Sequence, residues 1–374
     1  MLRRCVCGLA LLALDCRQLP PRVTTPAARS SALPASAALK SPFDVAGRRA
    51  LIGRELSEPP PETVDAPILN VTGVSFYTDA RHSVIDPQLE AANRAELAPL
   101  RQYVKRVTRL ADAFVESRPA RSAYAAQAGH ALGRWARARA LLGNVNHQGE
   151  YEREWTLGGL ALAYLEVQPD VDAGDEAVIS AWLCKIAEQV EPYYARPELE
   201  SARNNHAYWA GLAVSAAGVV CQRRDLFDWG LARARVGLAQ IDERGTLPLE
   251  LGRGKLALHY HRFALSPLVM LAELASANGI PLYDENHGAL RRLAARVIDG
   301  FADPSTFEAL TGEAQEVKLP PAGSDLAWAE LYFARFHDAR LAAWLSAARP
   351  LVDERLGGDL TIAFGAVLTV PSEK

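Results

Sequence analysis

The chain has 374 residues, of which 49% are hydrophobic and 23% are charged, as in a globular protein with a large core. The 41 basic and 44 acidic residues leave a net charge of -3, which excludes a whole-molecule field that would draw the chain onto nucleic acid or an anionic membrane. Since no apolar run approaches the roughly 20 residues that cross a bilayer, we expect no membrane span. Any anionic substrate must be bound by a local group of cations.

The N-terminus has the order of a secretory signal, in which basic residues precede an apolar stretch. Arg3 and Arg4 come before apolar residues 5–14, and Asp15 interrupts the pattern early. Pro, Ala, Ser and Arg then dominate residues 18–39, a composition that cannot bury enough apolar surface to fold. We therefore predict a leader and Pro/Ala-rich tether over residues 1–45, and a periplasmic or secreted location.

The cysteines divide between this leader and the body of the chain. Three of the five fall at positions 5, 7 and 16, which leaves Cys184 and Cys221 for the mature protein. Both lie in apolar segments with a helical pattern. This context favours two small buried thiols over a disulfide.

From residue 87 onward, apolar residues recur about every 3.6 positions in segments separated by Gly, Pro, Asn or Asp. These segments predict helices over residues 87–117, 124–142, 152–167, 175–189, 205–221, 225–243, 265–278 and 286–301. Because they are similar in length and lack a heptad seam or a solenoid repeat, they favour antiparallel helix pairs. We predict an all-α toroid with a cleft at one end, as one domain over residues 46–374. Residues 360–370 are expected to form a terminal strand or a buried tail.

Residues 203–211 begin an apolar helix with an unusual group of polar and aromatic side chains. Asn204 is suited to cap this helix, because its side chain can accept a hydrogen bond from a free backbone N–H. Capping does not explain the next polar and aromatic residues, whose polar groups cost stability when they are buried without partners: Asn205, His206, Tyr208 and Trp209. An amide, an imidazole and an indole within one turn can all contact one ligand.

A second polar group lies in residues 253–261. If residues 253–260 are helical, Arg253 and Tyr260 lie two turns apart on nearly the same face. The guanidinium and the phenol would then point together into a cleft. A solvated arginine and a packed tyrosine are the alternative, but the density of polar residues here favours a segment that lines a cleft.

Together the two stretches resemble the signature of mannuronate-type alginate lyases, polysaccharide lyase family 5. The residues that carry the resemblance are Asn204, Asn205, His206, Tyr208 and Trp209 in the first stretch, and Leu247, Glu250, Arg253, Tyr260, His261, Phe263 and Pro267 in the second. Further similarity at Trp135, Asn146, His147 and Trp155 extends it from about residue 77 to residue 364. The resemblance implies an incomplete (α/α) toroid that cleaves an acidic polysaccharide by β-elimination.

The resemblance also implies a role for each catalytic residue. Asn205 and Arg253 would bind the substrate carboxylate, and neutralising it makes the C5 proton of a uronate removable. His206 and Tyr260 would move protons, and a nearby cation would make the Tyr260 phenolate accessible. On a mannuronate, Tyr260 can act as base and acid because proton and leaving group share one face. On a guluronate, His206 is the better base.

The expected substrate-binding residues combine aromatic rings, which can stack on sugars, with polar side chains near the cleft. They are Tyr77, Trp135, Asn146, His147, Asn204, Trp209 and His259, and Trp155 is a further candidate for stacking. Trp135, Trp155 and Trp209 cannot all line the cleft, and one of them is expected in the core. Residues 75–79 are similar to a mobile lid of the family, in which a lysine is expected where this chain has Phe76.

We therefore expect a monomeric lyase for an anionic polysaccharide, most favourably polymannuronate or alginate, that gives 4,5-unsaturated uronate ends. Glucuronan or another acidic exopolysaccharide is the next substrate. A glycoside hydrolase would need two opposed carboxylates, for which Glu250 with Asp242 or Glu243 is the nearest supply. A polysaccharide-binding protein without activity is the third alternative. No cofactor or metal is expected, because HExxH and CxxC patterns are absent.

Overall fold

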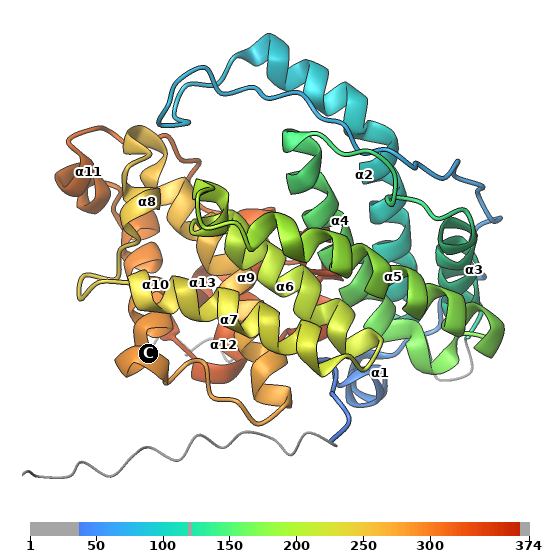
Figure 1. The fold of residues 1–374 in the computed structure, drawn as a ribbon. Coiled ribbons are helices and arrows are strands. Elements are labelled where there is room, and N and C mark those ends of the chain that lie inside the picture. Colours follow the sequence, from blue (N-terminus) through green and yellow to red (C-terminus); the bar gives the residue numbers. More distant parts are fainter. Residues whose placement is uncertain (1–36, 119–121, 367–374) are drawn as a thin grey trace, which may run out of the picture. The chain divides into compact units, whose positions relative to one another are not determined.

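The computed structural model describes residues 37–118 and 122–366, and this part of the chain is mostly helical (Figure 1). The longer helices are α2 (Pro87–Glu116), α3 (Ala123–Arg137), α4 (His147–Val167), α5 (Ala173–Tyr194), α6 (Asn205–Val220), α7 (Arg224–Gln240), α9 (Ala257–Ala277) and α10 (Glu285–Ala302). The shorter ones are α1 (Val45–Ile52), α8 (Pro248–Leu251), α11 (Ser305–Thr311), α12 (Trp328–Phe336), α13 (Ala339–Ala348) and α14 (Leu360–Phe364). Strands β1 (Val352–Asp353) and β2 (Gly358–Asp359) form one antiparallel pair.

All eight helices predicted from the apolar period are confirmed, with some shifted ends. The largest shift is in α9, which begins at Ala257 rather than at residue 265, because its first two turns already bury Leu258 and Phe263. Residues 360–364 form a helix rather than a strand, since the Asp359 side chain accepts hydrogen bonds from the backbone of Thr361 and Ile362. Leu360 is buried, as expected of a buried tail.

Three helices form an inner layer, because nearly their whole circumference is buried. These are α4, α6 and α9, and the positions on them that stay open to solvent gather mainly at their N-terminal turns. Figure 1 shows α6 between α5 and α7, and α6 also packs against α4 and α9. Since only residues 221–223 join α6 to α7, these two helices run antiparallel. The N-terminal parts of the inner helices lie together, since the ring centroid of Trp155 on α4 is 5.6 Å from that of His206 on α6 and 5.8 Å from that of Phe263 on α9.

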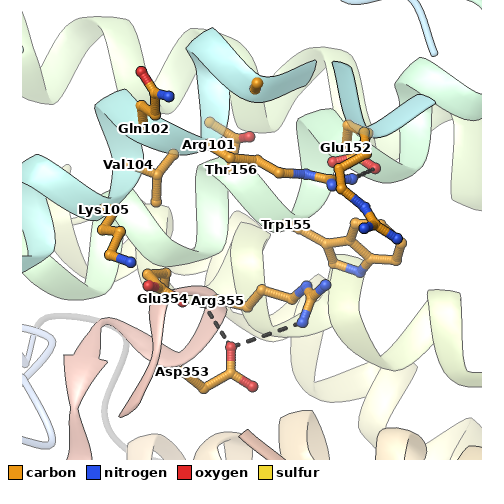
Figure 2. A pocket seen from close by; sticks show the side chains of 12 residues that line it. Arg101, Gln102, Val104, Lys105, Glu152, Trp155, Thr156, Asp353, Glu354 and Arg355 are labelled. Carbon is orange, nitrogen blue, oxygen red and sulfur yellow. Dashed lines mark hydrogen bonds and ion pairs between the residues drawn. The ribbon is translucent and has the colours of Figure 1, made fainter. Parts of the chain in front are cut away.

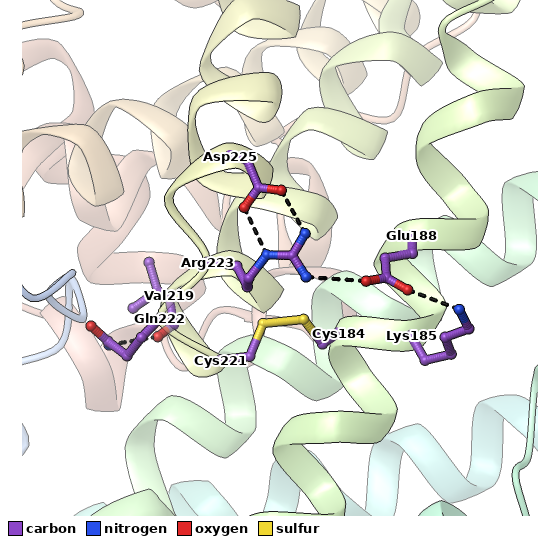
Figure 3. Close-up of a disulfide and its surroundings, with 8 residues drawn as sticks. All are labelled: Cys184, Lys185, Glu188, Val219, Cys221, Gln222, Arg223 and Asp225. Carbon is purple, nitrogen blue, oxygen red and sulfur yellow. Dashed lines mark hydrogen bonds and ion pairs between the residues drawn. A yellow bond between two sulfur atoms is a disulfide. The ribbon is translucent and has the colours of Figure 1, made fainter. Parts of the chain in front are cut away.

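The expectation of two separate thiols is wrong, because Cys184 and Cys221 form a disulfide (Figure 3). Their Cα atoms are 6.1 Å apart, within the range that a disulfide spans. Beside it, Arg223 pairs with Glu188 at 3.1 Å. The apolar pattern predicted buried cysteines, and both are half-buried, but the pattern carried no information on which helices are neighbours.

The predicted secretory signal lies within residues 1–36, outside the residues that the structure describes. Within the predicted tether, the Leu39 and Lys40 backbones donate hydrogen bonds to Gln222 and Asn278. In the described ranges, none of the helices has the length and apolar character needed to cross a membrane.

Candidate active site

The first turn of α6 is built by a cap that the sequence predicted. Asn204 accepts a hydrogen bond from the His206 backbone N–H at 3.0 Å, which is how an asparagine begins a helix. Its side chain is buried in this role. The cap fixes the backbone of Asn205 and His206, whose side chains leave the same turn.

Asn205 is 0% exposed and is held by one carboxylate. Its backbone N–H and its Nδ2 both donate to Glu250 Oε1, at 2.8 and 3.0 Å. Glu250 lies on α8 and is also 0% exposed, and burial raises the pKa of its carboxyl group while Arg253 opposes that rise. The Arg253 Nε lies 3.8 Å from the second Glu250 oxygen. One buried glutamate therefore positions both residues expected to bind the substrate carboxylate.

Arg253 and Tyr260 lie together as predicted, but they do not lie on the one continuous helix that was predicted. Gly254 has a φ of +56°, residues Gly254–Leu256 form a 3-10 turn, and α9 begins only at Ala257. The two side chains thus come from separate elements. The turn nevertheless places the guanidinium carbon of Arg253 4.6 Å from the centroid of the Tyr260 ring. The Arg253 side chain is only 6% exposed, so little water screens its charge from the ring.

The Tyr260 hydroxyl contacts the Tyr77 hydroxyl in a short hydrogen bond. Burial raises the pKa of Tyr260 well above its usual value, and the neighbouring Tyr77 adds to the rise. Arg253 lowers this pKa but does not offset the other effects. In the free protein, burial therefore favours the phenol form of Tyr260 over the phenolate that the Arg253 charge alone would favour.

Tyr77 belongs to a turn formed by residues 76–86, which we call the 76–86 turn. Within it Tyr77 pairs with Ile85 as an antiparallel bridge, and the Asp79 side chain accepts from the Ser83 and Val84 backbones at 2.7 Å. Arg81 joins the turn to the site, since its Nε donates to the Gly252 carbonyl at 3.1 Å. The segment with lid-like sequence therefore lies against the catalytic candidates.

The His206 imidazole is held on two sides. Its Nδ1 lies 3.0 Å from Glu154 Oε1, and the Tyr151 ring stacks on it with centroids 3.6 Å apart. The centroid of the Trp155 ring lies 5.6 Å from that of His206. Burial lowers the pKa of His206 well below its usual value, and the Arg253 charge lowers it further. The imidazole is therefore neutral at neutral pH.

Two tryptophans expected to bind sugar lie elsewhere. Trp135 is 1% exposed and stacks in parallel on Tyr103 at 3.6 Å, so it belongs to the core. Trp209 is 2% exposed and packs against Phe263. Neither ring offers a face to a sugar, because an apolar period alone does not distinguish a groove-lining indole from a core one. Trp155 is partly exposed, so its ring can still stack on a sugar.

The remaining expected residues lie at the rim or beside the catalytic candidates. Asn146 caps α4, accepting from the Gly149 backbone at 2.7 Å, and also bonds the Gly73 backbone. His147 is exposed, with its ring nitrogens 3.0 Å from the Tyr151 hydroxyl and 2.5 Å from that of Tyr193. His259 packs edge-on against Tyr260, 5.2 Å between centroids.

A cavity of about 380 Å³, which we call the groove, is lined in part by Trp155 (Figure 2). The Trp155 ring lies 5.6 Å from the His206 ring, so the groove is next to the catalytic candidates. No sequence pattern predicted it. Its cations are Arg94, Arg101, Lys105 and Arg355, and its acids are Glu152, Asp353 and Glu354. The Arg355 guanidinium lies 5.0 Å from the Trp155 ring. These cations come from α2 and from the segment before β2, more than 200 residues apart, so no local motif unites them.

In the two described ranges, no three His, Cys, Asp or Glu side chains are grouped to hold a metal ion. The site instead combines an amide, a guanidinium, a neutral imidazole and a phenol. On a helical toroid, beside a groove rich in cations, this set defines a polysaccharide lyase of the β-eliminating class.

Comparisons with known proteins agree with this class. The sequence model of the alginate lyase family matches residues 70–307. The chain is 39% identical over 308 residues to a polysaccharide lyase of Stenotrophomonas maltophilia strain K279a, covering 81% of this chain and 89% of that protein. It is 35% identical over 360 residues to an alginate lyase of Pseudomonas paraeruginosa PA7, covering 92% and 96%.

A solved structure is also similar. A tyrosine-to-phenylalanine variant of alginate lyase A1-III, complexed with a tetrasaccharide, superposes with a TM-score of 0.78 at 27% identity, covering 88% of this chain and 97% of that one. The crystal structure of A1-III from Sphingomonas species A1 gives a TM-score of 0.71. The chain belongs to the alginate lyase family. The predicted family, the (α/α) toroid and the lyase activity are confirmed.

Proposed function

We propose that this lyase cleaves alginate at the site around Arg253, with polymannuronate as the preferred polymer. The observation that carries the proposal is the position of the Arg253 guanidinium, which contacts the Tyr260 ring and lies beside the Glu250 that holds Asn205. A carboxylate bound by Arg253 and Asn205 would have its C5 carbon next to the phenol. Relatives named as alginate lyases support alginate over glucuronan.

In the proposed reaction, Arg253 and Asn205 bind the uronate carboxylate. Asn205 Nδ2 gives one hydrogen to Glu250 and has a second for the substrate. Charge-assisted hydrogen bonds stabilise the negative charge that moves onto the carboxylate as C5 loses its proton. The C4–O bond then breaks, which leaves a double bond between C4 and C5.

Tyr260 and His206 handle the protons. On a mannuronate, the Tyr260 phenolate takes the C5 proton and returns it to the departing glycosidic oxygen on the same face. Tyr260 must first lose its own proton, and the neutral His206 accepts that proton at Nε2, the ring nitrogen not bonded to Glu154. On a guluronate, His206 would take the C5 proton itself and Tyr260 would act as the acid.

The groove of Figure 2 supports a polymeric anion as substrate. Four cations line it and Arg355 lies beside Trp155, so a sugar ring stacked on the indole would place its carboxylate near Arg355. The alternative of a glycoside hydrolase is disfavoured at Glu250, because its Oε1 already accepts hydrogen bonds from the backbone and the side chain of Asn205.

We also propose that the protein is exported and acts as a monomer. The Cys184–Cys221 disulfide supports export, since disulfides persist in oxidising compartments. The proposed site uses residues of a single chain, so the proposed reaction requires no second copy.

The test is incubation with polymannuronate, polyguluronate and glucuronan, monitored by the ultraviolet absorbance of 4,5-unsaturated uronate. We expect absorbance to rise fastest with polymannuronate. Arg253→Ala should reduce the rate at least a hundredfold, whereas Arg54→Ala, at an exposed ion pair with Glu116, should not change it. Products without the conjugated double bond, or full activity of Arg253→Ala, would refute the proposal.

A further inference from the structure

Glu154 is a fully buried carboxylate in the second turn of α4. Its side chain is 0% exposed, yet one oxygen lies 3.0 Å from His206 Nδ1. Burying a carboxylate costs several kcal/mol unless partners compensate for the lost water. Later turns of α4 bury apolar residues such as Leu160 and Leu162. An ordinary packing role would therefore be filled at lower cost by an apolar side chain.

The geometry around His206 gives this carboxylate a defined effect. An imidazole that donates from Nδ1 to a carboxylate must carry its hydrogen on Nδ1, which leaves the lone pair on Nε2. Tyr151, stacked at 3.6 Å with an interplanar angle of 17°, prevents the ring from tilting away. When Glu154 is ionised, the first contact sets the tautomer, and the stacked Tyr151 ring sets the plane of the imidazole.

We propose that Glu154 is a positioning residue that fixes His206 in the Nδ1–H tautomer, with Nε2 presented to the substrate as a proton acceptor. This deepens the proposed function and rests on it for the role of His206. When Nε2 takes a proton, the resulting imidazolium keeps its Nδ1–H toward Glu154, whose carboxylate stabilises the positive charge. No proton passes to Glu154, as in other carboxylate–histidine pairs.

The groups that surround this pair affect both partners. The groups that shift the pKa of Glu154 are Tyr194 on α5 and Glu150 and Glu152 on α4, and those that shift the pKa of His206 are Arg253, His147 and His82. Burial raises the pKa of Glu154 and lowers that of His206, so burial disfavours the charged form of both residues. If Glu154 held the proton instead, it would donate to Nδ1, and Nε2 would carry the hydrogen. The two arrangements are therefore distinguishable by where the imidazole hydrogen lies.

The experiment labels the histidines of the full chain with 15N and compares wild type with Glu154→Gln. The His206 signals are identified by their loss in His206→Ala. We expect the wild type to show a protonated Nδ1 and an unprotonated Nε2 at neutral pH. In Glu154→Gln the amide can either accept from or donate to Nδ1, so this pattern should be lost. The kcat should fall at least tenfold while KM changes less than threefold.

A matched control is Glu166→Gln, a buried glutamate three turns further along α4 and away from His206. It should leave the His206 signals and kcat unchanged. If Glu154→Gln does not fold, Glu154→Asp tests the same point, because it keeps the charge but withdraws the carboxylate by one carbon–carbon bond. It should weaken the Nδ1–H pattern and lower kcat.

A wild-type His206 protonated on Nε2, or variants at Glu154 with the wild-type pattern and kcat, would overturn the proposal. A wild-type protein that makes no unsaturated products would refute the proposed function instead. The position of the hydrogen on His206 would still decide the role of Glu154.

Discussion

Glu250 Oε1 accepts hydrogen bonds from both the backbone N–H and the side-chain Nδ2 of Asn205, at 2.8 and 3.0 Å, inside a fully buried site. A single oxygen thereby fixes the start of α6 and the orientation of its amide. The same glutamate lies within 3.8 Å of Arg253. Two residues that are 48 positions apart are thus aligned by a third, buried residue.

Removal of the Glu250 carboxylate should therefore affect stability and activity together. Glu250→Ala leaves the buried donors of Asn205 without a partner, which costs about 1–3 kcal/mol of the free energy of unfolding. We expect kcat/KM to fall at least tenfold. Urea denaturation and the absorbance assay measure the two effects. Glu250→Gln keeps an acceptor oxygen, so a loss equal to that of Glu250→Ala would contradict this role.

Tyr260→Phe should remove the chemical step and little else. The ring keeps its place over Arg253 and only the hydroxyl is lost, so kcat should fall about 10²–10⁴-fold with KM nearly unchanged. The pKa of Tyr260 is raised by burial, so a phenolate that persists without a proton on His206 forms only as pH increases. The wild-type rate should therefore rise toward alkaline pH. If the residual activity of Tyr260→Phe still rises toward alkaline pH, the rise comes from the titration of another group.

Arg355 should contribute to binding but not to chemistry. Arg355→Ala removes a half-exposed cation beside Trp155, so KM for alginate should rise roughly fivefold, equivalent to about 1 kcal/mol, with kcat unchanged. The effect should shrink at high salt, because ions screen exposed charges. Initial rates at two ionic strengths measure it, and Arg139→Ala is a control at an exposed position outside the groove. A fall in kcat instead of a rise in KM would place Arg355 among the reacting groups.

The disulfide should stabilise the fold without affecting catalysis. Cys184 and Cys221 are 37 residues apart, and cross-linking such a loop restricts the unfolded chain by about 3–4 kcal/mol. A Cys184→Ala, Cys221→Ala double variant should lose about this much free energy of unfolding and keep its kcat. Under reducing conditions the wild type should become as unstable as the variant. A difference that persists in reductant would point to packing of the sulfurs.

Asp112 should make stability depend on pH. Burial raises its pKa to about 8, with the carboxylates of Asp359, Glu354 and Glu116 adding to the rise. The folded state thus holds this proton more tightly than the unfolded chain, in which the pKa is near 3.8. The stabilisation is complete below pH 4 and is lost as pH rises through 8. The side chain in Asp112→Asn cannot ionise. The Tm of this variant minus that of the wild type should therefore increase from pH 5 to pH 9.

The control for this pH series is Asp170→Asn, at an exposed position. Its Tm should follow that of the wild type across the same range. If Asp112→Asn also follows the wild type, the Asp112 carboxyl group is ionised or neutral in both states alike, and its burial has no effect on stability.

The sequence by itself determined the helices, because an apolar period of 3.6 residues gives each amphipathic or buried helix a recognisable pattern. It also determined the Asn204 cap, whose partner is only two residues away. The two motifs identified the family and the four candidate catalytic residues. These are local properties, since each depends on residues within one or two turns.

The tertiary structure decided what depends on neighbours that are distant in the chain. It placed Trp135 against Tyr103 in the core, joined Cys184 to Cys221, and brought Glu154 to His206. It also set the pKa of Tyr260, because burial and the Tyr77 contact outweigh the Arg253 charge. Such effects follow from which helices pack together, and an apolar period records that a face is buried without recording what covers it.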